Sequence, residues 1–298
     1  MKLSFITVDV FTSTRYAGNP LAIVEVPANQ KETLTQAQKQ AIAAEFNLSE
    51  TVFVHLAAPD AKDTNEFIVD IFITKAEIPF AGHPTIGSAY YLLHLQQQPA
   101  EAVITKAGRI PISIDPVSKI VKASTPHDFH VHEITFTSQL TGKPSPCVAI
   151  VKGMNFILVP LPDLPALAHA VENLCADSYN TSVLDAGWQT SGIIGTMYYV
   201  FQGVDEAGNK MYRTRMHGMS TEDPGTGSAS CALGSWLALQ ESTHEGKGPF
   251  RYAFTQGVEM GRRNEIAVEV VRDEKGTGIE SVVLSGTAVK VMEGNLEV

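Results

Sequence analysis

The segment Asp223-Pro-Gly-Thr-Gly-Ser-Ala229 shares its Pro, Gly, Ser and Ala, at the same spacing, with the earlier segment His83-Pro-Thr-Ile-Gly-Ser-Ala89. We call this seven-residue pattern the paired motif. It looks like a phosphate loop but lacks the lysine that a Walker loop requires. Its two copies lie 140 positions apart, and the elements predicted around them follow the same order along the chain. The sequence therefore predicts an internal duplication that forms two similar domains.

Each copy of the paired motif is predicted to start a helix. Proline is favoured in the first turn of a helix and a polar residue often caps it, so His83 and Asp223 are the expected caps. The glycines would let a ligand approach backbone N–H groups, which attract an anion together with the helix dipole. We expect both helix starts to hold one carboxylate in a cleft between the domains. The alternative is that Asp223 is only a cap.

The stretches that follow the paired motif are apolar almost all round. Residues 89–95 and 229–239 leave no polar face, which predicts helices buried on every side and wrapped by sheet. Thr35 is expected to cap a surface helix that ends at Phe46. A second surface helix is expected over 164–174, and the polar residues 116–146 are expected to cross from one half to the other.

Composition narrows the classes of partner and compartment. The net charge is −10 and the chain has no block of lysines or arginines, which disfavours nucleic acid and anionic membrane as partners. Three cysteines without a CxxC pair disfavour a disulfide framework or a thiolate zinc site and favour a reducing compartment. The N-terminal residues 1–12 alternate as a strand rather than a signal peptide, so a cytoplasmic protein is expected.

Four segments together resemble the phenazine-biosynthesis PhzF-like isomerases, and they appear in that family's order: Tyr16–Ala22, Asn47–Phe53, Pro79–Gly87 and Glu222–Ala229. The segment Ser285–Val289 also fits. The resemblance implies an α+β fold similar to diaminopimelate epimerase, with two pseudo-symmetric domains. Each domain would be a curled antiparallel sheet around a central buried helix. It also implies a homodimer, no cofactor, and an active site in the cleft between the domains.

The expected domain limits follow from the duplication and the resemblance. The N-terminal domain is expected over residues 1–118 and the C-terminal domain over 119–287. The last strand, about 288–298, is expected to return to the N-terminal domain.

The same resemblance assigns the site residues. It implies that Glu50 shuttles a proton and that His83 and Asp223 act beside it as catalytic residues. The expected substrate-binding residues come from both copies of the paired motif and from one pocket asparagine: Asn19, Gly82, Thr85, Ile86, Gly87, Gly225, Thr226, Gly227 and Ser228.

The residues around Glu50 support such a role independently. Leu48, Val52 and Phe53 are apolar and would desolvate the carboxyl, which raises its pKa toward the range useful for proton transfer. The alternative is a solvated loop glutamate, since glutamate is rarely buried. The family's epimerase relatives use two cysteines at the helix starts, whereas this chain has none there. Cys231, further along, is expected to be a core thiol.

Other chemistries have weaker support. His127, His130, His132 and Glu133 could suit a metal, because alternate residues of a strand share a face. The family needs no metal, and we expect none. The sequence contains no G-x-S-x-G, no HExxH and no dinucleotide-binding G-x-G-x-x-G after a strand.

Three hypotheses remain from the sequence. The first is a cofactor-independent isomerase that moves a proton between carbons of a small carboxylate. The others are a carboxylate-binding protein without catalysis and a racemase that uses carboxylates instead of cysteines. The best-known reaction of the family isomerises trans-2,3-dihydro-3-hydroxyanthranilate, but the sequence of this chain does not identify its substrate.

Overall fold

The computed structural model describes residues 1–57, 65–218 and 221–298. The chain forms two compact units. Unit 1 comprises residues 1–124 and 285–298, and unit 2 comprises residues 125–284. In the described ranges, no helix is both long and apolar enough to span a bilayer.

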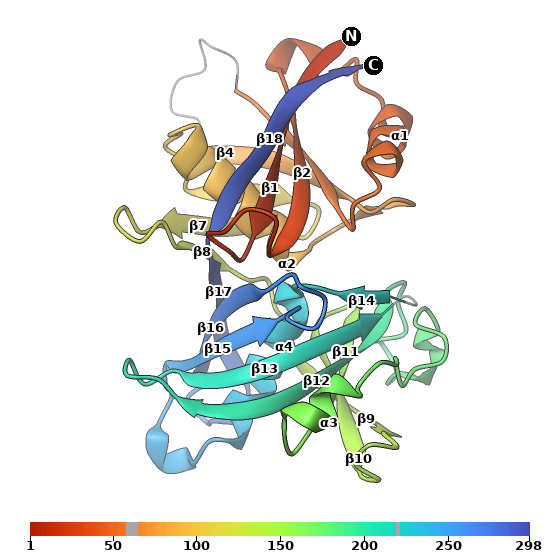
Figure 1. The fold of residues 1–298 in the computed structure, drawn as a ribbon, viewed down its shortest axis with the longest axis vertical. Coiled ribbons are helices and arrows are strands. Elements are labelled where there is room, and N and C mark those ends of the chain that lie inside the picture. The colour runs from red at the N-terminus through yellow and green to blue at the C-terminus, as the bar shows by residue number, and fades with distance from the viewer. Residues whose placement is uncertain (58–64, 219–220) are drawn as a thin grey trace. The chain divides into compact units, whose positions relative to one another are not determined.

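The described residues of unit 1 form a twisted mixed sheet and two α-helices (Figure 1). Its strands are β1 (Lys2–Val10), β2 (Asn19–Val26), β3 (Thr51–His55), β4 (Glu66–Phe72), β5 (Glu77–Ile78), β6 (Ala102–Thr105), β7 (Gly108–Ile114), β8 (Val121–Ser124) and β18 (Ala288–Glu297). Its α-helices are α1 (Gln36–Phe46) and α2 (Gly82–Tyr90), and a π-helical turn continues α2 over Tyr91–Leu95. Although β18 ends the chain, it pairs with β1 in antiparallel register from Lys2↔Glu297 to Val10↔Ala288.

Unit 2 has the same kinds of element. Its strands are β9 (His130–Thr137), β10 (Pro144–Val151), β11 (Met154–Pro160), β12 (Ile193–Val204), β13 (Lys210–Gly218), β14 (Thr221–Asp223), β15 (Phe250–Gln256), β16 (Asn264–Arg272) and most of β17 (Ile279–Gly286). Its α-helices are α3 (Leu164–Ala168) and α4 (Gly227–Gln240).

The two units repeat one topology. In unit 1 the strands pair in the order β18-β1-β2-β3-β4-β6-β7, with parallel pairs only at β2–β3 and β4–β6. In unit 2 the order is β9-β10-β11-β12-β13-β15-β16, and the parallel pairs fall at the corresponding places, β11–β12 and β13–β15. The helices α2 and α4 also occupy equivalent places in the two orders. This correspondence confirms the α+β fold of two pseudo-symmetric domains that the sequence predicts.

Each unit wraps its sheet around one helix. All nine residues of α2 are buried, and the helix packs against β1, β2, β3, β7, β8 and β18. Ten residues of α4 are buried, and it packs against β10, β11, β15 and β16. Apolar residues on every face leave these helices no stable place except inside a curled sheet.

The surface helix α1 begins and ends on local signals. Thr35 caps it, because its hydroxyl accepts a hydrogen bond from the Gln38 N–H and the Gln38 side chain accepts from the Thr35 N–H. Asn47 ends the helix in the left-handed conformation, with φ 50°. The predicted helix over 35–46 with its Thr35 cap is confirmed, and the turn at Asn47 places Glu50 directly before β3.

The predicted caps at the paired motif are wrong. Helix α2 begins at Gly82, with Ala81 as its cap residue, so His83 lies inside the first turn. Helix α4 begins at Gly227, after the cap residue Thr226, so Asp223 lies in the preceding loop. No described side chain caps either helix by a hydrogen bond. Asp223 instead accepts hydrogen bonds from the Gly225 N–H at 3.3 Å and the Thr226 hydroxyl at 2.5 Å, which keeps residues 223–226 in a turn.

One other prediction also differs from the structure. The helix expected over 164–174 stops at Ala168, because Arg215 donates hydrogen bonds to the Leu167 and Ala168 carbonyls at its C-terminal end. The stretch 116–146 passes from unit 1 to unit 2 after Ser124, as expected, and it also contains β8, β9 and the start of β10. Its polar residues occupy exposed positions that alternate with buried ones, for example in β8.

Gly87 allows α2 to approach the sheet closely. A Cβ at this position would lie 2.5 Å from Leu21 Cδ2 and 3.0 Å from Val10 Cγ2, which are both in the buried core. Gly87→Val should therefore lower the unfolding free energy by about 2–3 kcal/mol through overpacking. Urea unfolding followed by circular dichroism measures the change.

The neighbouring Ser88 provides the control. Its hydroxyl is fully buried and has no hydrogen-bond partner among the described residues. Ser88→Ala should leave the unfolding free energy unchanged or raise it by up to about 1 kcal/mol. Equal losses in both variants would contradict close packing at Gly87.

Candidate active site

Glu50 lies between α1 and β3, with most of its side chain withdrawn from solvent. Its side chain is 16% exposed, and Oε2 has no hydrogen-bond partner among the described residues. His83 Nε2, in the first turn of α2, is 3.6 Å from this oxygen. The fold of unit 1 thus brings together two of the predicted catalytic residues, although they are 33 positions apart in the chain.

Asn19 orients the ring of His83. The Asn19 Nδ2 amide, at the start of β2, lies 3.3 Å from His83 Nδ1. An amide NH₂ group can only donate, so Nδ1 accepts and the neutral ring carries its proton on Nε2. That N–H group faces Glu50. Asn19, His83 and Glu50 therefore form a polar chain that ends at a carboxylate oxygen with hydrogen-bonding capacity to spare.

Burial changes the acidity of Glu50. Loss of solvation raises the pKa of its carboxyl from 4.5 to about 7, against a smaller opposing effect of a hydrogen bond from the Ser49 side chain. A carboxyl with such a pKa is present in both protonation states near neutral pH. It can therefore act as a base and then as an acid in one reaction cycle.

The start of α2 supplies the remaining predicted residues of unit 1. The Thr85 hydroxyl donates to the Ala81 carbonyl at 2.8 Å, and Ile86 and Gly87 face the packed core. Thr85 N–H donates to Ala81 O, so Gly82 N–H precedes the first intrahelical bond. Backbone N–H groups at a helix start favour an anion.

In unit 2 the loop before α4 is held by two buried amides. Gln256 accepts from the Thr226 N–H at 3.1 Å and donates to the Asp223 carbonyl at 2.8 Å and the Thr226 hydroxyl at 3.0 Å. Asn264 donates to the Pro224 carbonyl at 2.6 Å. Gly225 is required beside it, since a Cβ there would lie 2.3 Å from Asn264 Oδ1. The predicted residues Gly225, Thr226, Gly227 and Ser228 belong to this fixed loop and the first turn of α4.

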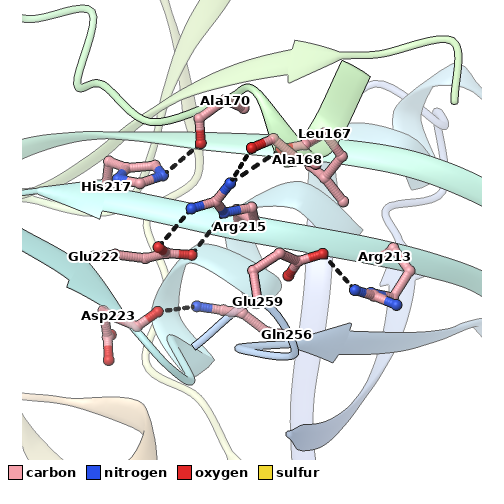
Figure 2. A network of polar contacts seen from close by, with 10 residues as sticks. All are labelled: Leu167, Ala168, Ala170, Arg213, Arg215, His217, Glu222, Asp223, Gln256 and Glu259. Atoms are coloured by element: carbon pink, nitrogen blue, oxygen red, sulfur yellow. Dashed lines mark hydrogen bonds and ion pairs between the residues drawn. The ribbon is translucent and has the colours of Figure 1, made fainter. Parts of the chain in front are cut away.

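A second network fixes the strand that carries Asp223 (Figure 2). Arg215 of β13 makes two parallel hydrogen bonds of 2.7 Å to the carboxylate of Glu222 in β14. His217 bonds the Ala170 carbonyl at 2.8 Å, and Arg213 pairs with Glu259 at 2.5 Å. Two-pronged arginine–carboxylate pairs are the most geometrically specific ion pairs. The Arg215–Glu222 pair therefore ties β14 to β13 next to the pairing Met216↔Asp223.

The cysteines do not supply a reactive thiolate. Cys231 in α4 is fully buried, and burial raises the pKa of its thiol to about 12. Burial likewise raises the pKa of Cys147 to about 12. A thiol with such a pKa is almost entirely protonated at neutral pH and is a poor base.

Comparison with known proteins identifies the family. A family model described as phenazine biosynthesis-like protein (PhzC-PhzF) matches residues 8–294. The chain belongs to the PhzC-PhzF family. An uncharacterised isomerase from Pasteurella multocida is 31% identical, over 97% of this chain and 92% of its own. The trans-2,3-dihydro-3-hydroxyanthranilate isomerase of Pseudomonas aeruginosa is 25% identical over 97% of this chain and 98% of its own. These relatives and the family membership make the protein an isomerase.

A solved structure supports the fold of this PhzC-PhzF protein. The phenazine biosynthesis protein of the PhzF family from Bacillus anthracis superposes with a TM-score of 0.77, covering all of both chains at 20% identity. This likeness shows the fold alone. The family and the fold expected from the four sequence segments are both confirmed.

The sequence does not reveal the residues that hold the site in place. Gln256, Asn264 and Arg215 lie outside the paired motif, and each resembles an ordinary strand residue in the sequence. Their alternation with apolar neighbours predicts burial for some of them, and a buried amide or arginine needs partners. The identity of those partners depends on strand pairing, which the sequence does not specify.

The raised pKa of Glu50 predicts a pH dependence of stability. Between pH 4.5 and about 7 the unfolded carboxyl ionises while the native one keeps its proton, so the unfolding free energy falls as pH rises. The total loss is about 3 kcal/mol and is complete above the native pKa. Glu50→Gln removes this contribution.

Urea unfolding at a series of pH values measures the difference in unfolding free energy between wild type and Glu50→Gln. This difference should fall by about 3 kcal/mol between pH 4.5 and about 7. Glu45→Gln, at an exposed position of α1, is the matched control and should show no such trend. A difference for Glu50→Gln that is constant with pH would contradict the raised pKa.

Proposed function

We propose that the protein is a cofactor-independent isomerase in which Glu50 moves a proton between two carbons of a small carboxylate substrate. The supporting observation is the environment of Glu50. Its carboxyl is largely buried, its pKa is raised to about 7, and the oriented N–H of His83 lies 3.6 Å away.

The proposed reaction needs one group that both accepts and returns a proton. Ionised Glu50 removes a proton from a C–H that is acidified by conjugation with the substrate carboxylate or a double bond. Protonated Glu50 then returns it to a different carbon, so the substrate keeps its atoms and its charge. A pKa near neutral pH favours the rate, because neither the removal of the proton by Glu50 nor its return is then strongly unfavourable.

His83 has a distinct part in this proposal. Its Nε2–H can donate to a substrate oxygen or nitrogen, or to the ionised form of Glu50, and Asn19 keeps it in that tautomer. The substrate carboxylate would bind backbone N–H groups at the start of α2, at Gly82. The roles of Asp223 and of the start of α4 in unit 2 stay predictions from the resemblance to the family.

A racemase that uses thiols is disfavoured by the buried, protonated cysteines. The substrate class is supported by a relative. The Pseudomonas aeruginosa relative is named for trans-2,3-dihydro-3-hydroxyanthranilate, a cyclic amino carboxylate. That compound is the first probe for this chain.

A homodimer and a cytoplasmic location, both expected from the sequence, are part of the same proposal. Sedimentation measures whether the protein is a dimer.

Turnover in heavy water tests the proposal. Wild-type protein should convert the correct carboxylate to an isomer. The deuterium content of its new C–H measures how much of the proton held by Glu50 exchanges with solvent before it is returned. Glu50→Gln should lower kcat by at least about 10³-fold, because the amide cannot carry the proton, while substrate binding changes little. Glu45→Gln should retain full activity.

The alternatives give different results in the same experiment. Deuterium exchange with inversion at one carbon and no shift of a double bond would indicate a racemase. Tight binding without any exchange would indicate a binding protein. Full turnover by Glu50→Gln would refute the role of Glu50.

A further inference from the structure

Strand β9 and a distant loop bring two histidines and an aspartate together in unit 2. His130 and His132 are alternate residues of β9 and therefore share a face. Asp185 reaches them from the loop after a short 3₁₀ turn, Thr181–Val183. One ring nitrogen of each histidine and one carboxylate oxygen lie within 4.8 Å of one another. We call these three residues the His-His-Asp cluster.

The buried histidine of the cluster has a defined tautomer. Asn155 donates its amide NH₂ to the Ile193 carbonyl at 3.0 Å, which turns its Oδ1 toward His132 Nε2 at 3.2 Å. An amide oxygen only accepts, so the His132 proton is on Nε2. Nδ1 therefore carries a lone pair.

That lone pair lacks a partner. The His132 side chain is 0% exposed, and Nδ1 has no hydrogen-bond partner among the described residues. The negatively charged Asp185 Oδ2 lies 3.7 Å from Nδ1. A buried lone pair that faces a carboxylate is unfavourable unless a cation lies between them.

The carboxylate of Asp185 is held toward the same point. The Glu133 N–H contacts its two oxygens at 3.1 and 3.3 Å, and His130 Nε2 lies 2.7 Å from Oδ2. The His130 ring stacks on Trp188 with 4.6 Å between centroids and 11° between planes. Outer contacts of this kind, including the Asn155 bond to His132, are those that orient the ligands of metal sites.

We propose that His130, His132 and Asp185 bind a divalent transition-metal ion, with zinc as the preferred ion. His130 Nε2, His132 Nδ1 and Asp185 Oδ2 would be the ligands, and water would complete a four-coordinate shell. Two imidazoles and one carboxylate are a typical donor set for zinc. Ligand atoms around a tetrahedral zinc are about 3.3 Å apart, so small side-chain rotations bring the cluster to that spacing.

The side chains of His130 and Asp185 are 33% and 23% exposed, so an ion can enter from solvent. The ion would connect the loop around Asp185 to β9. It takes no part in the proton transfer proposed for Glu50.

Metal titration tests the site. Protein without an affinity tag is stripped with a chelator and titrated with Zn²⁺ by calorimetry and with Co²⁺ by visible absorption. We expect one ion per chain and the intense d–d bands of four-coordinate Co²⁺. His132→Ala and Asp185→Asn should each weaken binding by at least about tenfold. His130→Ala should do the same, and because its side chain is a third exposed, this variant disturbs the core least.

His127→Ala is the matched control. This histidine belongs to the same segment, but its ring contacts the Thr125 carbonyl at 3.2 Å and lies outside the cluster. It should bind Zn²⁺ as wild type does. Absence of Zn²⁺ binding by folded wild-type protein would overturn the proposal. Equal binding by wild type, His130→Ala and Asp185→Asn would also overturn it, since the ion would then bind elsewhere.

Discussion

The burial of one helix inside each curled sheet is the constraint on which the rest of the structure depends. Helices α2 and α4 have no polar face, so the strands must surround them. Close approach of strands to helix requires glycine where they meet, as at Gly87 against Leu21. It also withdraws the residues at each helix start from bulk water. The chemistry of the site follows from that withdrawal, because a carboxyl beside a buried helix start loses much of its solvation.

The two units share a topology but differ at the paired motif. In unit 1 the helix starts directly at the motif, and His83 lies in its first turn beside Glu50. In unit 2 the motif first forms a turn, which Gln256 and Asn264 hold through its backbone, and the helix starts four residues after Asp223. Glu50 has no acidic equivalent in unit 2, since Thr190 lies 140 positions after it. Duplication of the scaffold has therefore left the proposed acid–base group in a single copy.

Local signals made some elements predictable from the sequence. Thr35 and Gln38 form a capping box within four residues, so α1 could be located correctly. The apolar stretches after the paired motif similarly identified both buried helices. The helix expected over 164–174 failed because its end is determined by Arg215, more than forty positions away. The cap at Asp223 failed because Gln256 and Asn264, 30 and 40 positions from the atoms that they bond, set the loop conformation.

The residues of the candidate site were likewise predictable from the sequence only in part. Resemblance to the family pointed to Glu50, His83 and Asn19, but their distances and the tautomer of His83 depend on strand and helix packing. The alternation of His130 and His132 was visible in the sequence, whereas Asp185 joins them only through the fold.

The central claim is that burial makes Glu50 a proton carrier at neutral pH, and a titration of its side-chain carboxyl by ¹³C NMR tests it most directly. The resonance is assigned by its absence in Glu50→Gln. The account predicts a titration midpoint at about pH 7. A midpoint near 4.5, the ordinary value for glutamate, would contradict it.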